Sequence, residues 1–198
     1  MAAPVPFVGL TGGLGSGKST ALAVLGELGA EVISSDAVVH ELYGGEQLRD
    51  AVVARFGAQV APGGVVDRSA IAERAFADPA DRGWLEGVVW PLVGARVAAW
   101  LEEVRARRPA PRAAVVEVPL LFEAGLEGIY DATIAVVSEE ELRRSRAEAR
   151  GHALVDERAE RQMSQAEKAR RATFVVGNDG SVEDLRRELS SVLDKLGV

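Results

Sequence analysis

The sequence of 198 residues contains no cysteine, only two histidines, and few aromatic residues, which make up 5% of the chain. Without cysteine, disulfides, thiolate metal sites and thiol redox chemistry are excluded. Neither His40 nor His152 has a second ligand at the spacing of a metal site, and no Ser/His/Asp arrangement stands out. The scarce aromatic residues form no stacking platform for nucleic-acid bases.

Long hydrophobic runs are also missing. No apolar stretch approaches the roughly 18 residues of a membrane-spanning helix. The first four residues lack the basic region and apolar core of a signal peptide, so we expect a cytoplasmic protein with no membrane partner. The formal net charge of −7 argues against a nucleic-acid partner. An acidic protein that binds polyphosphates must gather its arginines locally.

One glycine-rich stretch has the pattern of a phosphate-binding loop. Residues 12–20 read Gly-Gly-Leu-Gly-Ser-Gly-Lys-Ser-Thr and fit G-x-x-x-x-G-K-[ST]. An apolar run of strand length, 5–10, precedes the loop, and residues at helical spacing, 21–28, follow it. A glycine-rich turn with a chance lysine is the alternative, but the strand–loop–helix context favours phosphate binding.

Each residue type in this loop suits a nucleoside triphosphate. Glycines adopt backbone angles closed to other residues, so successive N–H groups can point at phosphate oxygens near a helix N-terminus. Lys18 is predicted to neutralise the β- and γ-phosphates, and the hydroxyl of Ser19 to ligate Mg²⁺. The predicted ATP-binding residues are Gly13, Gly15, Ser16, Gly17, Lys18, Ser19 and Thr20.

The rest of the chain alternates predicted strands with predicted helices. This alternation indicates an α/β fold with a parallel sheet covered on both faces, in a single domain. We expect strands at 5–10, 31–34, 113–118, 132–137 and 174–176. We expect helices at 21–28, 35–43, 46–56, 67–77, 80–89, 92–107, 139–150, 155–163 and from 181 to 197. Trp90-Pro91 should separate two of these helices, Ser138 with Glu141 should form a capping box, and Ser181 should cap the last helix.

Two acids stand at positions that suit phosphoryl transfer. Asp36 follows the second predicted strand, where it could accept a proton from an attacking hydroxyl or help to hold Mg²⁺; alternatively it only complements a helix dipole. Glu117 interrupts an apolar strand, where a buried acid is costly unless it is paired or lies near a metal. The alternative for Glu117 is an edge position that faces water.

Two further segments leave their roles open. The stretch 119–123, which includes Leu120, Leu121, Phe122 and Glu123, could line an acceptor pocket or could be core packing. Residues 138–171 interleave nine cations with eight acids, which is typical of solvated helices with ion pairs one turn apart. Arg146 and Arg150 share a helix face, however, and could instead close over a triphosphate as part of a lid.

These residues together resemble the dephospho-CoA kinase family over nearly the whole chain. The phosphate loop, the strand end at 33–36, the Asp67-Arg68 helix, the stretch 116–123 and Tyr130-Asp131 are similar to its motifs. So are the spacing of Arg146, Arg150, Arg158 and Gln162-Met163, and the ending 176–181. Three positions depart from the family pattern: Trp90 stands where a histidine is usual, Glu117 replaces an aspartate, and Ser34 replaces an acid.

The resemblance implies transfer of the γ-phosphoryl group of ATP to the 3′-hydroxyl of dephospho-CoA, the last step of coenzyme A biosynthesis. It implies a P-loop kinase with a five-stranded parallel core (1–43, 109–138 and 172–198), a helical acceptor region (44–108) and a lid (139–171). Asp36, Lys18, Arg146 and Arg150 would then be catalytic. Asn178 would join the ATP site, Glu117 and Asp36 would join Ser19 at Mg²⁺, and Trp90, Leu120, Leu121, Phe122, Glu123 and Asp36 would contact the acceptor.

Two rival interpretations remain at the level of the sequence. One is a kinase for another small acceptor, such as a nucleotide or a shikimate-like metabolite. The other is a nucleotide-dependent switch, although the Asn-Lys-x-Asp base-reading pattern of guanine switches is missing from the sequence. We expect a monomer.

Overall fold

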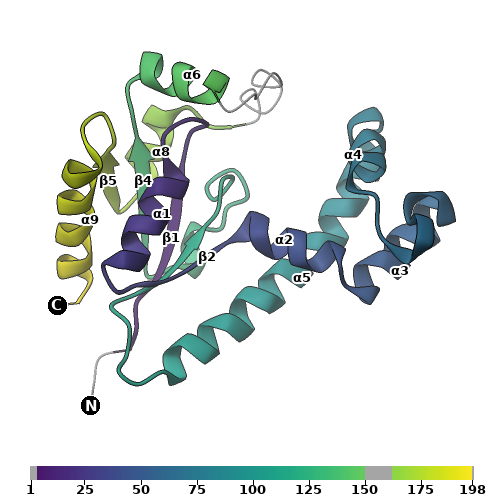
Figure 1. Ribbon diagram of the computed structural model, residues 1–198, viewed down its shortest axis with the longest axis horizontal. Helices are drawn as coiled ribbons and strands as arrows, with labels where there is room; N and C mark the ends of the chain where they lie inside the picture. The colour runs from purple at the N-terminus through teal and green to yellow at the C-terminus, as the bar shows by residue number, and fades with distance from the viewer. Residues whose placement is uncertain (1–3, 150–161, 198) are drawn as a thin grey trace. The chain divides into compact units, whose positions relative to one another are not determined.

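The computed structural model describes residues 4–149 and 162–197. The chain divides into two compact units (Figure 1). Unit 1 comprises residues 1–34 and 101–198, and unit 2 comprises residues 35–100. The phosphate loop belongs to unit 1, whereas Asp36 and Trp90 belong to unit 2.

Unit 1 is built on a five-stranded parallel sheet, which confirms the predicted fold class. The strands lie in the order β2-β3-β1-β4-β5, and all four pairings are parallel. Their bounds are β1 (Phe7–Gly12), β2 (Glu31–Ser34), β3 (Ala114–Glu117), β4 (Ala132–Val137) and β5 (Phe174–Gly177). The chain leaves β1 toward β2, at one edge of the sheet, and leaves β4 toward β5, at the other edge. Open parallel sheets bind ligands at the carboxyl ends of two adjacent strands whose connections run in opposite directions, which here are β1 and β4.

The two faces of β1 are packed by different elements, because successive side chains of a strand point to opposite faces. Val8 and Leu10 contribute to a core shared with α1 (Lys18–Glu27) and α9 (Val182–Leu196), which pack against each other (Figure 1). On the other face, a Cβ on Gly9 would meet Leu121 and Tyr130. The segment that follows β3 therefore covers this second face.

Two further helices among the described residues of unit 1 lie between β4 and β5. They are α6 (Glu140–Ala149) and α8 (Gln165–Arg171), and α8 packs against β4 and β1. Ser181 forms the predicted capping box with Asp184 at the start of α9. The predicted helix at 155–163 lies largely outside the described residues.

The predicted capping box of Ser138 and Glu141 is wrong. Helix α6 begins at Glu140, so Ser138 stands too early to cap it. The Ser138 hydroxyl instead donates to the Asn178 carbonyl (3.3 Å) and accepts from Arg146 (3.2 Å). The turn after β5 provides the missing acceptor, because the backbone N–H of Glu139 donates to Asp179 Oδ1 at 2.6 Å.

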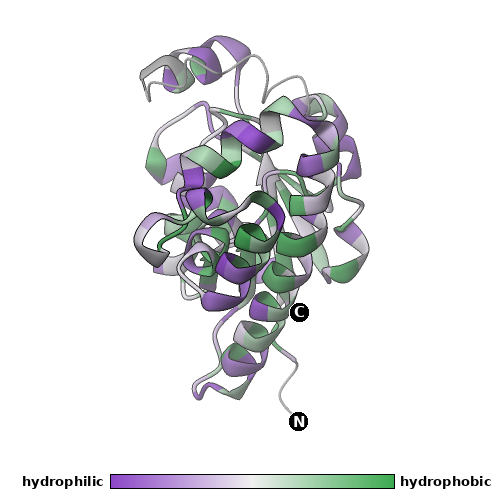
Figure 2. Cartoon of the chain, turned by 90° about the vertical axis from the view of Figure 1, so that its right-hand side faces the viewer, coloured by the Kyte–Doolittle hydropathy of each residue, from purple (hydrophilic) through white to green (hydrophobic). Residues whose placement is uncertain are grey.

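Unit 2 is helical and has its own core. It contains α2 (Ser35–Tyr43), α3 (Glu46–Phe56), α4 (Arg68–Ala77) and most of α5 (Pro79–Ala106), with short 3₁₀ turns at Ala58–Val60 and Pro62–Gly64. Its helices carry both hydrophobic and hydrophilic residues along their length (Figure 2). Leu48, Val52, Phe56, Val60, Ala61, Val66, Ile71 and Val89 form the buried core.

Helix α5 runs through Trp90-Pro91 without a break, so the two predicted helices are one element. A proline inside a helix removes one hydrogen bond to the carbonyl four residues earlier, here that of Gly87. Both Pro91 and Gly87 are exposed, so water can satisfy that carbonyl. Leu92 and Val93 pack against the same core as Val89, which holds both halves of the helix in line.

Within the described residues, no helix is long and apolar enough to cross a membrane.

Candidate active site

The phosphate loop joins the C-terminal end of β1 to the first turn of α1. Gly15 and Gly17 have φ values of 75° and 92°, in the left-handed region that favours glycine. The ammonium of Lys18 donates to the carbonyls of Gly12 (3.0 Å) and Gly13 (3.1 Å), so its side chain folds back over the loop. The loop therefore presents a lysine and a helix N-terminus on the same short segment, an arrangement that suits phosphate groups.

Neighbouring chain segments close tightly on this loop. The Asn178 amide donates to the Ser16 carbonyl at 2.8 Å, and a Cβ on Gly17 would lie 1.9 Å from that amide nitrogen. A Cβ on Gly15 would lie 2.3 Å from the carbonyl oxygen of Arg143. Glycine at 15 and 17 is thus required both by backbone angle and by space.

One buried polar atom of the loop remains available to a ligand. Among the described residues, the Ser16 hydroxyl has no hydrogen-bond partner although the residue is fully buried. A buried hydroxyl without a partner is costly, and an oxygen of a bound phosphate would satisfy it. The loop therefore fits a polyphosphate ligand.

The predicted metal ligands of unit 1 come from helix α1 and strand β3. Ser19 is exposed in the first turn of α1. Glu117 is the last residue of β3, is 7% exposed, and is paired in register with Leu10 of β1. No group of three acidic or histidine ligands exists among the described residues. A hydroxyl and one carboxylate beside a triphosphate nevertheless fit Mg²⁺, which keeps waters and phosphate oxygens as its other ligands.

Two arginines of α6 reach the loop and its surroundings, while Arg150 lies outside the described residues. Arg146 donates to the Ser138 hydroxyl (3.2 Å) and to the Asn178 carbonyl (3.0 Å), so it bridges the ends of β4 and β5. Arg143 donates through Nε to the Leu14 carbonyl (3.1 Å). Sequence reasoning missed Arg143, because helical spacing alone does not reveal which arginine faces the loop.

The predicted acceptor residues of unit 2 lie on its surface. Asp36 stands exposed in the first turn of α2, and Trp90 is 54% exposed. One turn along α2, His40 contacts Arg68, whose guanidinium also lies 5.7 Å from the centroid of the Tyr43 ring. Burial raises the pKa of Tyr43, and the positive charge of Arg68 opposes that rise.

The segment after β3 is mostly buried inside unit 1. Leu121 is 0% exposed and Phe122 is 2% exposed, whereas Leu120 is 39% exposed. The carboxylate of Glu123 pairs with Lys168 of α8, at 2.8 Å from Nζ to Oε1. A direct acceptor contact of these residues stays a prediction, and Leu120 is the one among them with a large exposed surface.

Lys168 is the clearest departure from sequence reasoning. Its side chain is 0% exposed, so the interpretation of the 138–171 cations as solvated is wrong for this residue. Burial lowers the pKa of Lys168, and its contact with Glu123 works in the opposite direction. No local signal distinguishes it from the neighbouring Arg170 and Arg171.

Fold and loop together define a class of protein. A five-stranded parallel sheet with a glycine-rich phosphate loop after β1 is the architecture of P-loop kinases. Solved structures agree: a shikimate kinase from Bacteroides thetaiotaomicron is similar in fold, with a TM-score of 0.56 at 12% identity over 99% of this chain and 100% of that one.

The family follows from closer similarities. A family model described as dephospho-CoA kinase matches residues 6–184, and the chain belongs to that family. The dephospho-CoA kinase of Symbiobacterium thermophilum is 39% identical over 93% of this chain and 79% of its own length. That of Agrobacterium fabrum is 38% identical over 96% and 97%. A solved Thermus thermophilus structure shares 36% identity and a TM-score of 0.83, covering 98% of both chains.

Proposed function

We propose that this protein transfers the γ-phosphoryl group of ATP to the 3′-hydroxyl of the ribose of dephospho-CoA, producing coenzyme A and ADP. The hydroxyl oxygen forms a bond to the γ-phosphorus, and the bond from that phosphorus to the β–γ bridging oxygen breaks. The hydroxyl proton passes to a carboxylate and then to solvent. Membership of the dephospho-CoA kinase family, over residues 6–184, is the observation that carries the proposal.

On the donor side, the phosphate loop supplies the groups that this reaction needs. Phosphoryl transfer depends on positioning and charge neutralisation more than on covalent chemistry. Lys18 would place a positive charge beside the phosphates, and the loop N–H groups and the Ser16 hydroxyl would donate hydrogen bonds to the phosphate oxygens. Arg146, with Arg150, would stabilise the charge that spreads over the transferred group.

Magnesium completes the donor site in this proposal. Ser19 and Glu117 would hold the ion, which neutralises phosphate charge when it is bound.

On the acceptor side, Asp36 is the proposed partner of the ribose hydroxyl. An exposed carboxylate in the first turn of α2 is free to accept a hydrogen bond from a substrate. It would orient the hydroxyl and take its proton as the new bond forms. Trp90 would offer apolar contact to the acceptor, since an indole has no acid–base role near neutral pH. We further propose a monomer that acts on small molecules and not on nucleic acid.

A panel of acceptors tests the proposal directly. The protein is incubated with Mg-ATP and, separately, with dephospho-CoA, AMP, adenosine or shikimate, and ADP release is followed. We expect rapid multiple turnover with dephospho-CoA alone, with coenzyme A as the second product. Turnover with another acceptor, or binding of ATP with no turnover on any of them, would contradict the proposal.

A further inference from the structure

The ammonium of Lys168 is enclosed by protein and reaches acceptors on two different segments. It donates to the Pro119 carbonyl at 2.7 Å and to the Glu123 carboxylate at 2.8 Å (Oε1) and 3.1 Å (Oε2). The Thr11 hydroxyl lies at 3.5 Å from the same nitrogen and itself donates to the Pro119 carbonyl at 3.3 Å. One cation on α8 thus contacts groups from two segments that are far apart in the sequence, Thr11 on β1 and the stretch from Pro119 to Glu123.

Two of these groups stand where chemistry is expected. Thr11 directly precedes Gly12, the first residue of the phosphate-loop pattern, and Pro119 stands two residues after Glu117 at the end of β3. Because β1 and β3 are parallel neighbours, their C-terminal ends lie at the same edge of the sheet. Lys168 therefore ties the start of the phosphate loop to the start of the segment 118–125.

Glu123 extends the same network to another part of the chain. Its Oε1 atom also accepts the backbone N–H of Met163 at 2.8 Å. Met163 lies close before α8, which begins at Gln165. The carboxylate is therefore occupied by two donors from the segment 163–168, and its charge is balanced by the buried lysine.

A buried ion pair is a costly way to hold a protein together. Desolvation of both charges can exceed their mutual attraction, and apolar residues of similar volume often stabilise a fold as well or better. What an apolar replacement cannot supply is a set of directed hydrogen bonds to a carbonyl and a carboxylate. The network is thus better suited to fixing a geometry than to adding stability.

We propose that Lys168 is a positioning residue, which, through Glu123 and Pro119, holds the segment 118–125 in register with the phosphate loop so that donor and acceptor are bound in reacting geometry. This inference rests on the proposed function for its kinetic consequence. Glu123 then acts by holding its own segment in place and not as a direct contact to the acceptor.

The main test compares a single and a double variant. Lys168→Met removes the cation and leaves the Glu123 carboxylate, whose side chain is only 14% exposed, without its counter-charge, so we expect a large drop in melting temperature. Lys168→Met/Glu123→Gln removes both charges but keeps side-chain volume and an oxygen for the Met163 N–H, so the melting temperature should return close to that of the parent. Despite this recovery, we expect the KM for dephospho-CoA to stay raised about tenfold, or kcat to stay lowered by that factor. The Kd for ATP alone should change less than about threefold, because the phosphate loop keeps its own contacts.

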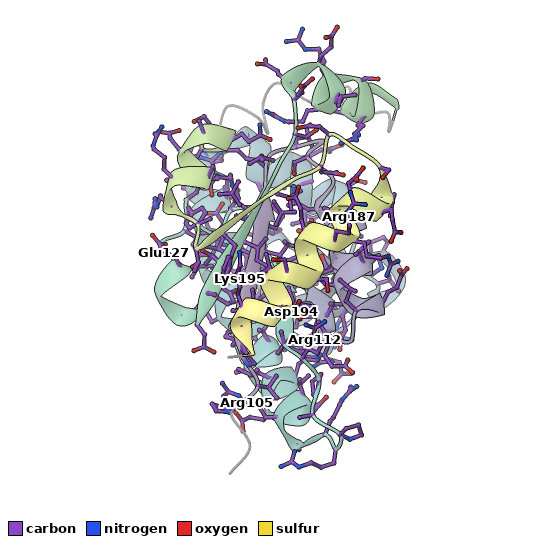
Figure 3. The ribbon with its side chains drawn as sticks, turned by 90° about the vertical axis from the view of Figure 1, so that its left-hand side faces the viewer. Arg105, Arg112, Glu127, Arg187, Asp194 and Lys195 are labelled. Carbon is purple, nitrogen blue, oxygen red and sulfur yellow. The ribbon has the colours of Figure 1, made fainter. Side chains whose placement is uncertain are left out.

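A second ion pair, between α8 and the 3₁₀ turn Glu127–Ile129 that follows the segment 118–125, is a control. Arg171, one turn after Lys168 on α8, pairs with Glu127, and both side chains are more than a third exposed (39% and 34%). Glu127 lies at the side of unit 1 (Figure 3). The Arg171 guanidinium also lies 5.1 Å from the centroid of the Phe122 ring, and a methionine there keeps a contact with that ring. Exposed pairs contribute little, so Arg171→Met/Glu127→Gln should leave both melting temperature and kinetics close to those of the parent.

A measurement without any substrate separates this inference from the proposed function. The amides of Ala124, Gly125 and Leu126 donate to carbonyls within the same segment. In the charge-free double variant, hydrogen exchange at these amides should be about tenfold faster or more, while amides of the phosphate loop keep their parental rates.

The outcomes are distinct. If the double variant recovers its melting temperature and also has parental exchange rates at 124–126 and parental kinetics, Lys168 is merely structural and the inference is overturned. Equal kinetic losses in the Arg171→Met/Glu127→Gln control would overturn it as well. If the parent protein fails to phosphorylate dephospho-CoA, the proposed function fails, while accelerated exchange would still show the coupling of Lys168 to its segment. Thr11→Val, which removes one hydroxyl and keeps its shape, should give a smaller change of the same kind in a variant that folds.

Discussion

The phosphate loop and the segment 118–125 begin at the same edge of the sheet, but they are held in different ways. The loop is shaped by backbone angles at Gly15 and Gly17 and by a lysine that bonds carbonyls five and six residues away. The segment 118–125 is held by Lys168, which stands 45 residues beyond Glu123. The contacts that shape the phosphate loop are local, so the sequence shows them as a motif. The contacts of Lys168 form only when residues distant in the sequence come together in the fold.

The difference has a limit, because the phosphate loop also depends on one distant residue. Asn178 donates to the carbonyl of Ser16, 162 residues earlier in the chain. The following predictions test whether each region of the site depends on neighbouring or on distant residues, from the largest expected effect to the smallest.

Lys18→Ala should nearly abolish turnover. Its ammonium is the cation that the phosphate-loop pattern itself supplies. Loss of a positively charged side chain that contacts the transferred phosphoryl group costs about 10³-fold or more in kcat. Lys18→Arg should fail too, because the guanidinium is larger than the ammonium that fits against the carbonyls of Gly12 and Gly13. Steady-state kinetics with Mg-ATP and dephospho-CoA measure both, and near-normal rates in either variant would contradict the assignment of the loop.

Asp36→Asn should lower turnover by about 10²- to 10⁴-fold, the usual scale for a positioned acid–base group. The change keeps the size of the side chain but removes its charge. ATP binding without acceptor should change little. A titration with Mg²⁺ separates the two candidate roles: recovery at high Mg²⁺ would make Asp36 a metal residue, and full activity at every concentration would contradict both roles.

Arg146→Ala should lower kcat by about 10- to 100-fold and weaken ATP binding far less, because contacts made only in the transition state are lost from kcat. In the structure Arg146 joins Ser138 to the Asn178 carbonyl, which offers a structural alternative. Arg144→Ala is the matched control, since Arg144 is 71% exposed and pairs with Glu140 on the same helix. A drop in melting temperature with an unchanged kcat would assign Arg146 to the structural alternative.

Gly17→Ala should weaken ATP binding about tenfold or more, because the new Cβ would lie 1.9 Å from the Asn178 amide at a positive φ that alanine adopts only with strain. Combining it with Asn178→Ala should relieve the contact but not the backbone strain, so binding should recover only in part. Gly83→Ala is the control: this glycine lies in α5 with nothing within 4 Å of an added Cβ, and the change should stabilise the helix by about 1 kcal/mol. Full recovery in the double variant would show that the distant contact, and not the local backbone, makes glycine necessary.

Much of the fold could be predicted because it depends on local patterns. The five strands are apolar runs bounded by turn residues, and Ser181 with Asp184 is a cap readable over four positions. The errors arose where a distant group decides. The Ser138 hydroxyl hydrogen-bonds with the Asn178 carbonyl and Arg146 and does not cap α6. Helix α5 continues through Pro91 because residues on both sides of the proline pack against the same core.

The candidate site divides in the same way. The phosphate loop, Ser19 and Glu117 follow from spacing and from the cost of a buried acid on a strand. Arg143 and Lys168 could not be found, because in a stretch crowded with cations the sequence does not show which side chain the fold turns inward.

Trp90→His should have the smallest effect on turnover, within about tenfold, or about 1.4 kcal/mol. Trp90 is 54% exposed on a continuous helix, and its neighbour Val89, not the indole, belongs to the core of unit 2, so the change should also leave the melting temperature nearly unaltered. An indole has no proton to exchange near neutral pH, whereas an imidazole does. If the imidazole raised turnover by about a hundredfold, or about 2.7 kcal/mol, an acid–base group would be missing from the acceptor side of the parent protein. A pH–rate profile of both proteins decides this, because a new catalytic imidazole must add an inflection near its own pKa, and parallel profiles would leave Trp90 with apolar contact alone.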